Sequence, residues 1–217
     1  MILTPVDPAA LQHILDVYAG VLEPASLAQT VFARIAATRA ACPGLVADLH
    51  AGRAKAIALA HRLGIPTCDE APEVAFSWDG CLLRTRSETS VVFHEIAHWQ
   101  LTPVERRGLP DFGLGAGPET GRVAEADAAT SVSAITKEHH EDLASLLGIL
   151  WEVEYAEPAL IAFAEQNWFE LYERASTPAH FVQCLRDLQT RGLISDDGRP
   201  LLTVSAQPRS CQTPAAR

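Results

Sequence analysis

Two histidines stand four residues apart in the run His94-Glu95-Ile96-Ala97-His98. On an α-helix this spacing is just over one turn, so both imidazoles project from the same face. Two ring nitrogens can then reach one metal ion at ~2.1 Å. Glu95 stands at the edge of that face, where its carboxylate can accept a proton from a metal-bound water. We therefore expect His94 and His98 to bind a catalytic metal ion and Glu95 to act as an acid–base group.

The residues around the two histidines indicate a buried helix over about 88–101. Ser87 and Thr89 can cap its start, and Pro103 follows its end. Most of its other side chains are apolar: Val91, Val92, Phe93, Ile96, Ala97 and Trp99. Two histidines and a glutamate in such a helix would be costly without partners, which favours a metal site over an unpaired structural role.

A third ligand must come from another part of the chain. The metzincin extension needs a glycine at position 101 and a histidine at position 104, but Leu101 and Val104 stand there. A carboxylate from a second helix is therefore expected, which would complete a site of two histidines and one acid. The candidates are Glu125, Asp127, Glu138, Glu141, Asp142, Glu152 and Glu154, with His139 and His140 as further options.

Glu141 is the preferred third ligand. On a helical wheel it lies beside Ala144, Ser145 and Gly148, and these small residues would allow the helix to approach the metal helix closely. The same face can also be read as a solvent-exposed one, which leaves Glu125 as the second choice.

Composition limits the classes of partner. The 217-residue chain is 48% hydrophobic and 20% charged, as in an ordinary globular protein, and its formal net charge is −10. An acidic protein repels phosphates, so we expect no nucleic-acid partner. No apolar run approaches the ~20 residues of a membrane helix, and residues 1–8 do not look like a secretory signal. We therefore expect no membrane partner and a cytoplasmic protein.

The cysteines indicate reduced thiols. There are five, at positions 42, 68, 81, 184 and 211, and none forms a Cys-x-x-Cys pair. The odd count and wide spacing argue against a disulfide framework and against a cysteine zinc site.

The elements predicted around the motif define an α+β, mainly helical fold. Helices are expected over 8–19, 25–41 and 45–63, then over 137–155, from Pro158, and over 177–190. Two apolar runs, 74–78 and 81–85, flank Asp79-Gly80, which predicts a small antiparallel hairpin beside the metal helix, as in a zincin-like core. The Gly- and Pro-rich segment 108–121 is expected to be an ordered loop against the site.

The domain organisation follows from these elements. We expect one metal-binding catalytic domain over 1–195, in which 1–66 is a helical N-terminal part and 67–195 is the core of the metal site. Three prolines and polar residues predict a loosely ordered tail over 196–217.

Four runs follow one another over about Phe93 to Leu150: His94–Trp99, Asp111–Gly113, Pro118–Arg122 and the helix near Glu141. Taken in order, they resemble the bacterial elongation factor P hydroxylase family. That family has a His-Glu-x-x-His-Trp helix, an Asp-Phe-Gly run, a Pro-Asp-Gly-Arg stretch and a later helix that starts with a glutamate. This chain departs from the family in the loop, where Leu114-Gly115-Ala116 replaces aromatic residues and Pro118-Glu119-Thr120-Gly121-Arg122 has one extra residue.

The resemblance implies a non-haem iron oxygenase that hydroxylates a β-lysyl-lysine side chain on elongation factor P with O2. It implies Fe(II) held by His94 and His98, with Glu141 as the expected third ligand, and an acid–base or supporting role for Glu95. Two other hypotheses remain open from the residues. One is a zinc metallopeptidase of the type with a downstream glutamate ligand, in which Glu95 is the general base. The other is a metal-stabilised binding protein without turnover.

Overall fold

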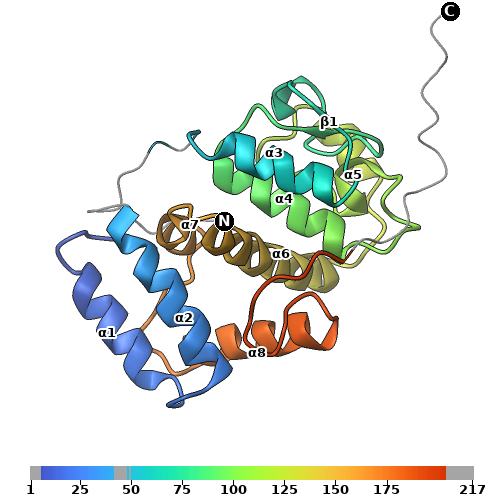
Figure 1. Cartoon of the computed structure of the whole chain (residues 1–217). Helices are drawn as coiled ribbons and strands as arrows, with labels where there is room; N and C mark the ends of the chain where they lie inside the picture. Colours follow the sequence, from blue (N-terminus) through green and yellow to red (C-terminus); the bar gives the residue numbers. More distant parts are fainter. Residues whose placement is uncertain (1–5, 42–47, 49, 204–217) are drawn as a thin grey trace, which may run out of the picture. The chain divides into compact units, whose positions relative to one another are not determined.

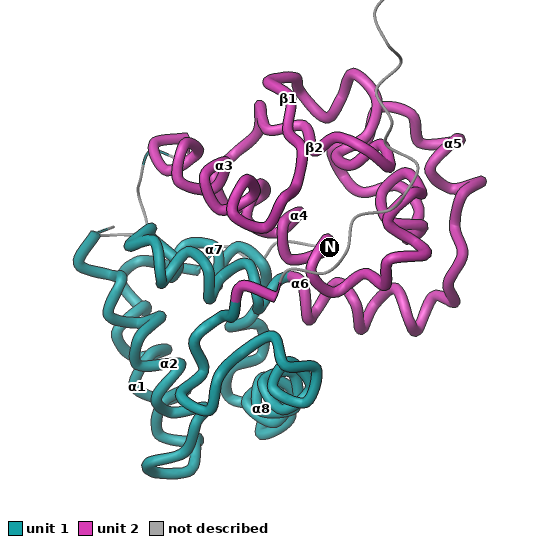
Figure 2. The backbone as a smooth tube through the Cα atoms, turned by 45° about the vertical axis from the view of Figure 1, so that its right-hand side comes forward, with its two compact units in different colours: residues 1–49, 145–201 teal, residues 50–144, 202–217 magenta. Residues whose placement is uncertain are grey.

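The computed structural model describes residues 6–41, 48 and 50–203. The chain divides into two compact units, one made of residues 1–49 and 145–201 and the other of residues 50–144 and 202–217 (Figure 2). The longest helix, α6 (Ala134–Glu154), begins in the second unit and ends in the first. All three predicted metal-ligand positions, 94, 98 and 141, belong to the second unit.

The first unit is helical. It contains α1 (Leu11–Val21), α2 (Leu27–Ala37), the 3-10 turn η1 (Thr38–Ala41), α7 (Ala159–Glu165), α8 (Ser176–Thr190) and the end of α6. Tyr18 of α1 lies at the centre of its core. The Tyr18 ring stacks on Phe32 at 4.7 Å between centroids and meets the rings of α7, α8 and the segment between them edge-on. The apolar faces of these amphipathic helices are therefore buried in this core.

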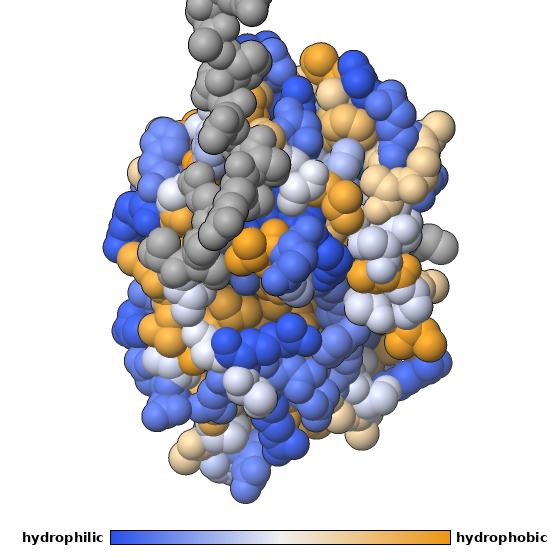
Figure 3. Space-filling view, turned by 90° about the vertical axis from the view of Figure 1, so that its right-hand side faces the viewer, coloured by the Kyte–Doolittle hydropathy of each residue, from blue (hydrophilic) through white to orange (hydrophobic). Residues whose placement is uncertain are grey.

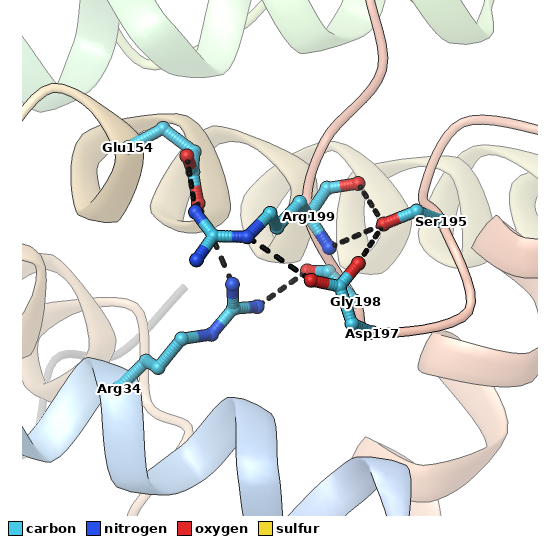
Figure 4. Close-up of polar contacts among 6 residues, drawn as sticks. All are labelled: Arg34, Glu154, Ser195, Asp197, Gly198 and Arg199. Atoms are coloured by element: carbon cyan, nitrogen blue, oxygen red, sulfur yellow. Dashed lines mark hydrogen bonds and ion pairs between the residues drawn. The ribbon is translucent and has the colours of Figure 1, made fainter.

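In the first unit, a polar cluster holds the segment after α8 against α2 and α6 (Figure 4). Arg199 Nη1 donates to both carboxylate oxygens of Glu154 on α6, at 3.0 and 2.9 Å. Arg34 of α2 donates from Nη2 to the carbonyl oxygen of Gly198 at 2.7 Å and also contacts Glu154. Residues 195–199 are thus held as a defined turn.

That turn lies in the segment for which the sequence predicts a loosely ordered tail. Ile194 and Pro200 form an antiparallel β-bridge just around it. In the second unit, Gln100 Nε2 donates to Thr203 Oγ1 at 3.4 Å. The described part of the tail therefore has fixed partners, and residues 204–217 lie outside the described residues.

The second unit surrounds the helix that carries the motif. Its elements are α3 (Arg53–Arg62), β1 (Thr67–Cys68), η3 (Pro72–Val74), β2 (Leu83–Arg84), α4 (Thr89–Leu101), η4 (Pro110–Gly113), α5 (Val123–Ala128) and the start of α6. Helix α4 is the predicted motif helix, and α3 lies alongside it (Figure 1). Val92, Phe93, Ile96 and Ala97 are fully buried, as the sequence predicts for this helix.

The only sheet among the described residues is a two-residue parallel pair, in which Thr67 pairs with Leu83 and Cys68 with Arg84. The predicted antiparallel hairpin over 74–78 and 81–85 is not confirmed as a pair of strands, although Trp78 and Leu83 form an isolated antiparallel bridge. The turn at Asp79-Gly80 does form, because Asp79 Oδ1 accepts from the backbone N–H groups of residues 81 and 82. A longer sheet of the zincin kind is not found in the described residues.

Most predicted helices are confirmed within a few residues. The prediction over 25–41 corresponds to α2 and η1, and the prediction over 137–155 to α6. Of the predicted helix 45–63, residues 53–62 are helical, whereas 45–47 and 49 lie outside the described residues. Helix α5 has no counterpart in the prediction, because its six residues are too short for helical periodicity to register.

The cysteines differ from the prediction at one position. Cys68 and Cys184 carry free thiols, but Cys81 is disulfide-bonded, so the prediction of reduced thiols is wrong there. Counts and spacings cannot identify which cysteines pair when the pairing is not local. Cys42 and Cys211 lie outside the described residues.

On the face drawn in Figure 3, hydrophobic groups are interspersed with hydrophilic ones. The most exposed large apolar side chains of the second unit are Ile135, Val74 and Val123, at 80%, 64% and 49% exposure. Within the part of the chain that the structure describes, no helix has the length and apolar character needed to cross a membrane.

Candidate metal centre

Three side chains converge from two helices of the second unit. His94 and His98 project from one face of α4, since they lie one turn apart, and Glu141 approaches from the second turn of α6. The two Nε2 atoms are 2.9 Å apart. Glu141 Oε2 lies 3.4 Å from Nε2 of His94 and 3.3 Å from Nε2 of His98. The structure thus brings together the two histidines and the third ligand preferred from the sequence.

The spacing of these atoms fits a single ion. Donors bound at ~2.0–2.1 Å lie roughly 2.9–3.4 Å apart when they subtend ~90–110° at the metal. The three edges measured here, 2.9, 3.3 and 3.4 Å, lie in this interval. The group could therefore hold a metal ion, and among the described residues it is the only such cluster of histidine, cysteine and carboxylate groups.

Burial and nearby charges shift the pKa values of His98 and Glu141 toward the protonation states that bind a cation. His98 is almost fully buried, and this burial lowers the pKa of its imidazole, although the charge of Glu141 opposes the effect. Neutral imidazole is the form that offers a lone pair to a metal. Burial alone would raise the pKa of Glu141, but its electrostatic interactions and hydrogen bonds with the two histidines outweigh burial and lower that pKa. The carboxylate is thus held in its ionised, metal-binding form.

Glu95 lies among other carboxylates. Burial raises its pKa well above the ordinary range, and the negative charges of Asp111, Glu141 and Glu119 raise it further, while a hydrogen bond from Ser77 opposes them. Like charges in a poorly solvated site disfavour ionisation of one another. Glu95 can therefore hold a proton beside the two histidines, which is the arrangement that an acid–base group needs.

The imidazole of His98 belongs to a row of stacked rings, which we call the four-ring stack: Trp78, Phe112, His98 and His140. Trp78 and Phe112 are 5.5 Å apart between centroids and inclined by 3°. Phe112 and His98 are 5.8 Å apart at 24°, and His98 and His140 are 5.1 Å apart at 12°. The predicted contact of loop 108–121 with the site is confirmed by the Phe112 ring.

The loop reaches His98 through a left-handed turn. Asp111 and Phe112 have φ of 42° and 58°, and Gly113 has φ of 68°. For the two residues that carry a Cβ, this conformation costs ~1–2 kcal/mol each. Buried hydrogen bonds hold it: Asp111 Oδ2 accepts from Thr120 Oγ1 at 2.6 Å, and the backbone N–H of Asp111 donates to the carbonyl oxygen of Trp78 at 2.8 Å.

The other candidate ligands lie outside the cluster. In the second unit, Glu125 is exposed and pairs with Arg122 at 3.5 Å, and Asp127 accepts from the backbone N–H of Ala116. The structure places the rest as follows: Glu138 exposed, His139 and Asp142 half-buried, His140 in the four-ring stack, and Glu152 and Glu154 in the first unit.

Sequence reasoning missed several residues that shape the site. It assigned no role to Ser77, Trp78, Asp111, Phe112 or Thr120, which come from loops and one 3-10 turn rather than from a periodic element. The available signal was the Asp-Phe-Gly run inside a glycine-rich segment, because adjacent glycines permit unusual backbone conformations. The run could not indicate which ring would meet a histidine.

Comparisons with known proteins add no relationship. No protein-family model matches the chain, and no curated protein and no solved structure matches it.

Proposed function

We propose that the chain is a metal-dependent enzyme, a non-haem iron hydroxylase that acts with O2 on a modified lysine side chain of a protein, with elongation factor P as the expected substrate. The observation that carries the proposal is the cluster of His94 Nε2, His98 Nε2 and Glu141 Oε2. Two histidines and one carboxylate on one face of an ion leave its other positions open, which is the ligand set of oxygen-activating non-haem iron. The resemblance over residues 93–150 supports the choice of substrate.

Three residues would hold the metal ion and a fourth would hold a proton beside it. His94, His98 and Glu141 would hold Fe(II), which when bound supplies the activation of O2. Glu95 would hold a proton beside the open positions, because its carboxyl favours the neutral form in this setting. Insertion of one oxygen atom into a C–H bond reduces the other to water, so two electrons and two protons must come from an external reductant.

A zinc peptidase is the alternative that uses the same ligands. Glu95 would then be the general base for a zinc-bound water. Peptidases often bind an extended substrate along an exposed strand, as in other cases of strand addition. The described residues provide only the two-residue strands β1 and β2, and this favours the hydroxylase.

Metal analysis of protein purified without oxygen tests the proposal. We expect about one iron per chain in the wild type, and loss of iron in His94→Ala and Glu141→Ala. Glu138→Ala is the matched control, since Glu138 is exposed on the same helix and lies outside the cluster. A control variant that loses as much iron as Glu141→Ala would contradict the assignment of Glu141.

The substrate is tested by mass spectrometry of elongation factor P that carries β-lysyl-lysine. Incubation with the iron-loaded enzyme, O2 and a reductant should add the mass of one oxygen atom. An unchanged mass with a fully iron-loaded enzyme would overturn the substrate assignment. Bound zinc together with peptide cleavage that Glu95→Gln abolishes would instead establish the peptidase. A metal-bound protein with neither activity would support a binding protein.

A further inference from the structure

We infer that Phe112 is a positioning residue for the metal ligand His98, and that the four-ring stack replaces the hydrogen bond by which a metal-binding histidine is usually oriented. This inference rests on the proposed metal site and concerns residues that the motif does not include. It predicts that the Phe112 ring controls metal affinity although no atom of Phe112 can bind a metal.

The plane of a metal-binding imidazole must be fixed by a contact with a neighbouring group. The χ2 torsion of histidine has a broad energy profile, so packing alone or a hydrogen bond must select the orientation that aims Nε2 at the metal. In most metal sites the second ring nitrogen donates to a carboxylate, a carbonyl oxygen or a water. Within the described residues, the buried Nδ1 atoms of His94 and His98 have no hydrogen-bond partner. Among the described residues, no side chain or backbone group therefore orients these two imidazoles through a hydrogen bond to Nδ1.

Stacked rings are the contacts that can fix the plane of the His98 imidazole. Its imidazole lies nearly parallel to the ring of Phe112 and to that of His140, at 24° and 12°. Rotation about χ2 would tilt the imidazole into these neighbours, because both rings lie along its face. Phe112 is itself held by Trp78, whose ring is inclined to it by only 3°. Trp78 is anchored through its indole N–H, which donates to the carbonyl oxygen of Arg107 at 2.6 Å.

The backbone at Phe112 supports a functional reading of this contact. Asp111 and Phe112 adopt left-handed conformations that residues with a Cβ rarely occupy. Strained residues persist where the surrounding structure forces them, and they occur preferentially at functional sites. Here the strain places the Phe112 ring on a metal ligand, and the buried hydrogen bond from Thr120 to Asp111 maintains the turn.

The test compares variants that delete or retain the ring. Phe112→Leu and Phe112→Met remove it with little loss of apolar volume, and Phe112→Tyr retains it. Phe76→Leu is the matched control, because Phe76 is a buried phenylalanine of the same unit that packs with Ala75 and Ala126. Zn(II) affinity is measured by competition with a chelating dye, the geometry of the site by the visible absorption of the Co(II)-loaded protein, and stability by thermal unfolding without metal.

We expect Phe112→Leu and Phe112→Met to weaken Zn(II) binding about 10- to 100-fold, the loss typical when an orienting partner of a ligand is removed. Their Co(II) spectra should shift, whereas Phe112→Tyr should keep the wild-type spectrum and affinity. Phe76→Leu should lower the metal-free unfolding temperature without either change. A spectral shift is an effect that a general loss of stability would not produce.

The outcomes separate this inference from the proposed function. Failure of the wild type to bind any metal would overturn the metal centre itself. A wild type that binds, together with ring-deleted variants that bind equally tightly and show unchanged spectra, would overturn only the role of Phe112. Equal losses in Phe112→Leu and Phe76→Leu would also overturn it, because the effect would then be one of packing. If Phe112→Leu does not fold, Phe112→Met decides in the same way.

Discussion

Negative charge is concentrated around the two imidazoles at the metal centre. Glu95, Asp111, Glu119 and Glu141 lie close enough for the other three to raise the pKa of Glu95. A divalent cation reverses this situation, because it becomes the largest local charge and stabilises the ionised carboxylates near it. The electrostatics of the cluster therefore favour the same conclusion as its geometry, that these side chains are arranged for a cation.

The buried hydrogen bond between Thr120 and Asp111 offers a test at a single residue. Thr120→Val keeps the shape of the side chain but removes the donor that lies 2.6 Å from Asp111 Oδ2. Leaving a buried carboxylate without its hydrogen-bond donor costs ~1–3 kcal/mol, so the free energy of unfolding should fall by about that amount in urea titrations. Thr190→Val is the control, since the Thr190 hydroxyl is exposed on α8. An equal, small loss in both variants would contradict a stabilising role for this bond.

At the scale of residues, the sequence predicts the positions of side chains that lie on a regular helix. The spacing of His94 and His98 was enough to place both imidazoles on one helix face, and the small residues near Glu141 indicated a close approach of helices. Phe112 could not be predicted in its place, because its contact with His98 depends on a left-handed turn that only tertiary contacts stabilise. Loop residues lack a repeating geometry from which a neighbour can be inferred.

Among the elements, loop 108–121 makes a very close backbone approach at its end. A Cβ added at Gly121 would lie 1.9 Å from the backbone carbonyl oxygen of Glu73, whereas a Cβ at Gly117 would come no closer than 3.7 Å to Thr120. Gly121→Ala should therefore separate the loop from residues 72–74 and cost several kcal/mol (~3 or more), as for a severe overpacking. Gly117→Ala should change the free energy of unfolding by less than ~1 kcal/mol.

Chemical denaturation of the two glycine variants, followed by tryptophan fluorescence, gives the comparison. Both positions lie in the same loop and receive the same added methyl group, so only the space around it differs. Similar unfolding midpoints for the two variants would show that the loop adapts freely, and would contradict the close approach at Gly121.

Helix α6 contains a buried carboxyl group that should make stability depend on pH. Glu152 is 3% exposed, and its Oε1 has no hydrogen-bond partner within the described residues. Burial raises its pKa well above the ordinary value, and the charges of Glu157 and Glu165 raise it further. The folded state then binds more protons than the unfolded state at every pH between the two pKa values. Stability should therefore decrease as the pH rises from about 4.5 toward the raised pKa, by up to ~1.4 kcal/mol per pH unit.

Glu152→Gln removes this dependence, because an amide carries no titratable proton. Urea unfolding at a series of pH values should show a smaller decrease in stability above pH ~4.5 for Glu152→Gln than for the wild type. Glu138→Gln, an exposed substitution on the same helix, serves as the control and should follow the wild type. A wild-type profile that rises over this range, or one that Glu152→Gln leaves unchanged, would contradict an unpaired buried carboxyl.

Helices were predicted more successfully than strands for a physical reason. An amphipathic helix such as α1 or α2 carries its periodic signal within its own residues. The pairing of β1 with β2 joins residues 67–68 to 83–84, and nothing in either dipeptide identifies the other. The turn at Asp79-Gly80 was recognised correctly, but the η3 turn at residues 72–74 takes up the first residue of the expected strand 74–78. Of the expected pairing, the described residues show one antiparallel bridge.

At the scale of the whole molecule, the division into two units had no signature in the sequence. Domain boundaries are usually sought in polar or Gly- and Pro-rich linkers. Of the three boundaries, the one at Ser145 falls inside α6, where residues on both sides are helical and buried. The single domain predicted over 1–195 followed from the order of the predicted elements. Two segments far apart in sequence, 1–49 and 145–201, combine to make the first unit, and composition cannot reveal that combination.

This division makes removal of the metal a test of the molecule as a whole. All three ligands belong to the second unit, so an ion should stabilise that unit directly. At a free metal concentration 100 times Kd, binding stabilises the bound state by ~2.7 kcal/mol. Hydrogen–deuterium exchange should therefore slow in α4 and at residues 134–141 when metal is present, while α1 and α2 exchange at unchanged rates. Addition of a chelator should reverse the effect.

Glu141→Ala provides the control for this experiment, since it removes a ligand from the second unit without changing the first. With metal added, its α4 should exchange as fast as that of the chelator-treated wild type. Slowing of equal size in α1 and α4 would show that both units open together in one cooperative transition, and would contradict a local effect of the ion. Unchanged exchange in α4 of the metal-loaded wild type would contradict the metal centre, because an ion held by both histidines of that helix must oppose its opening.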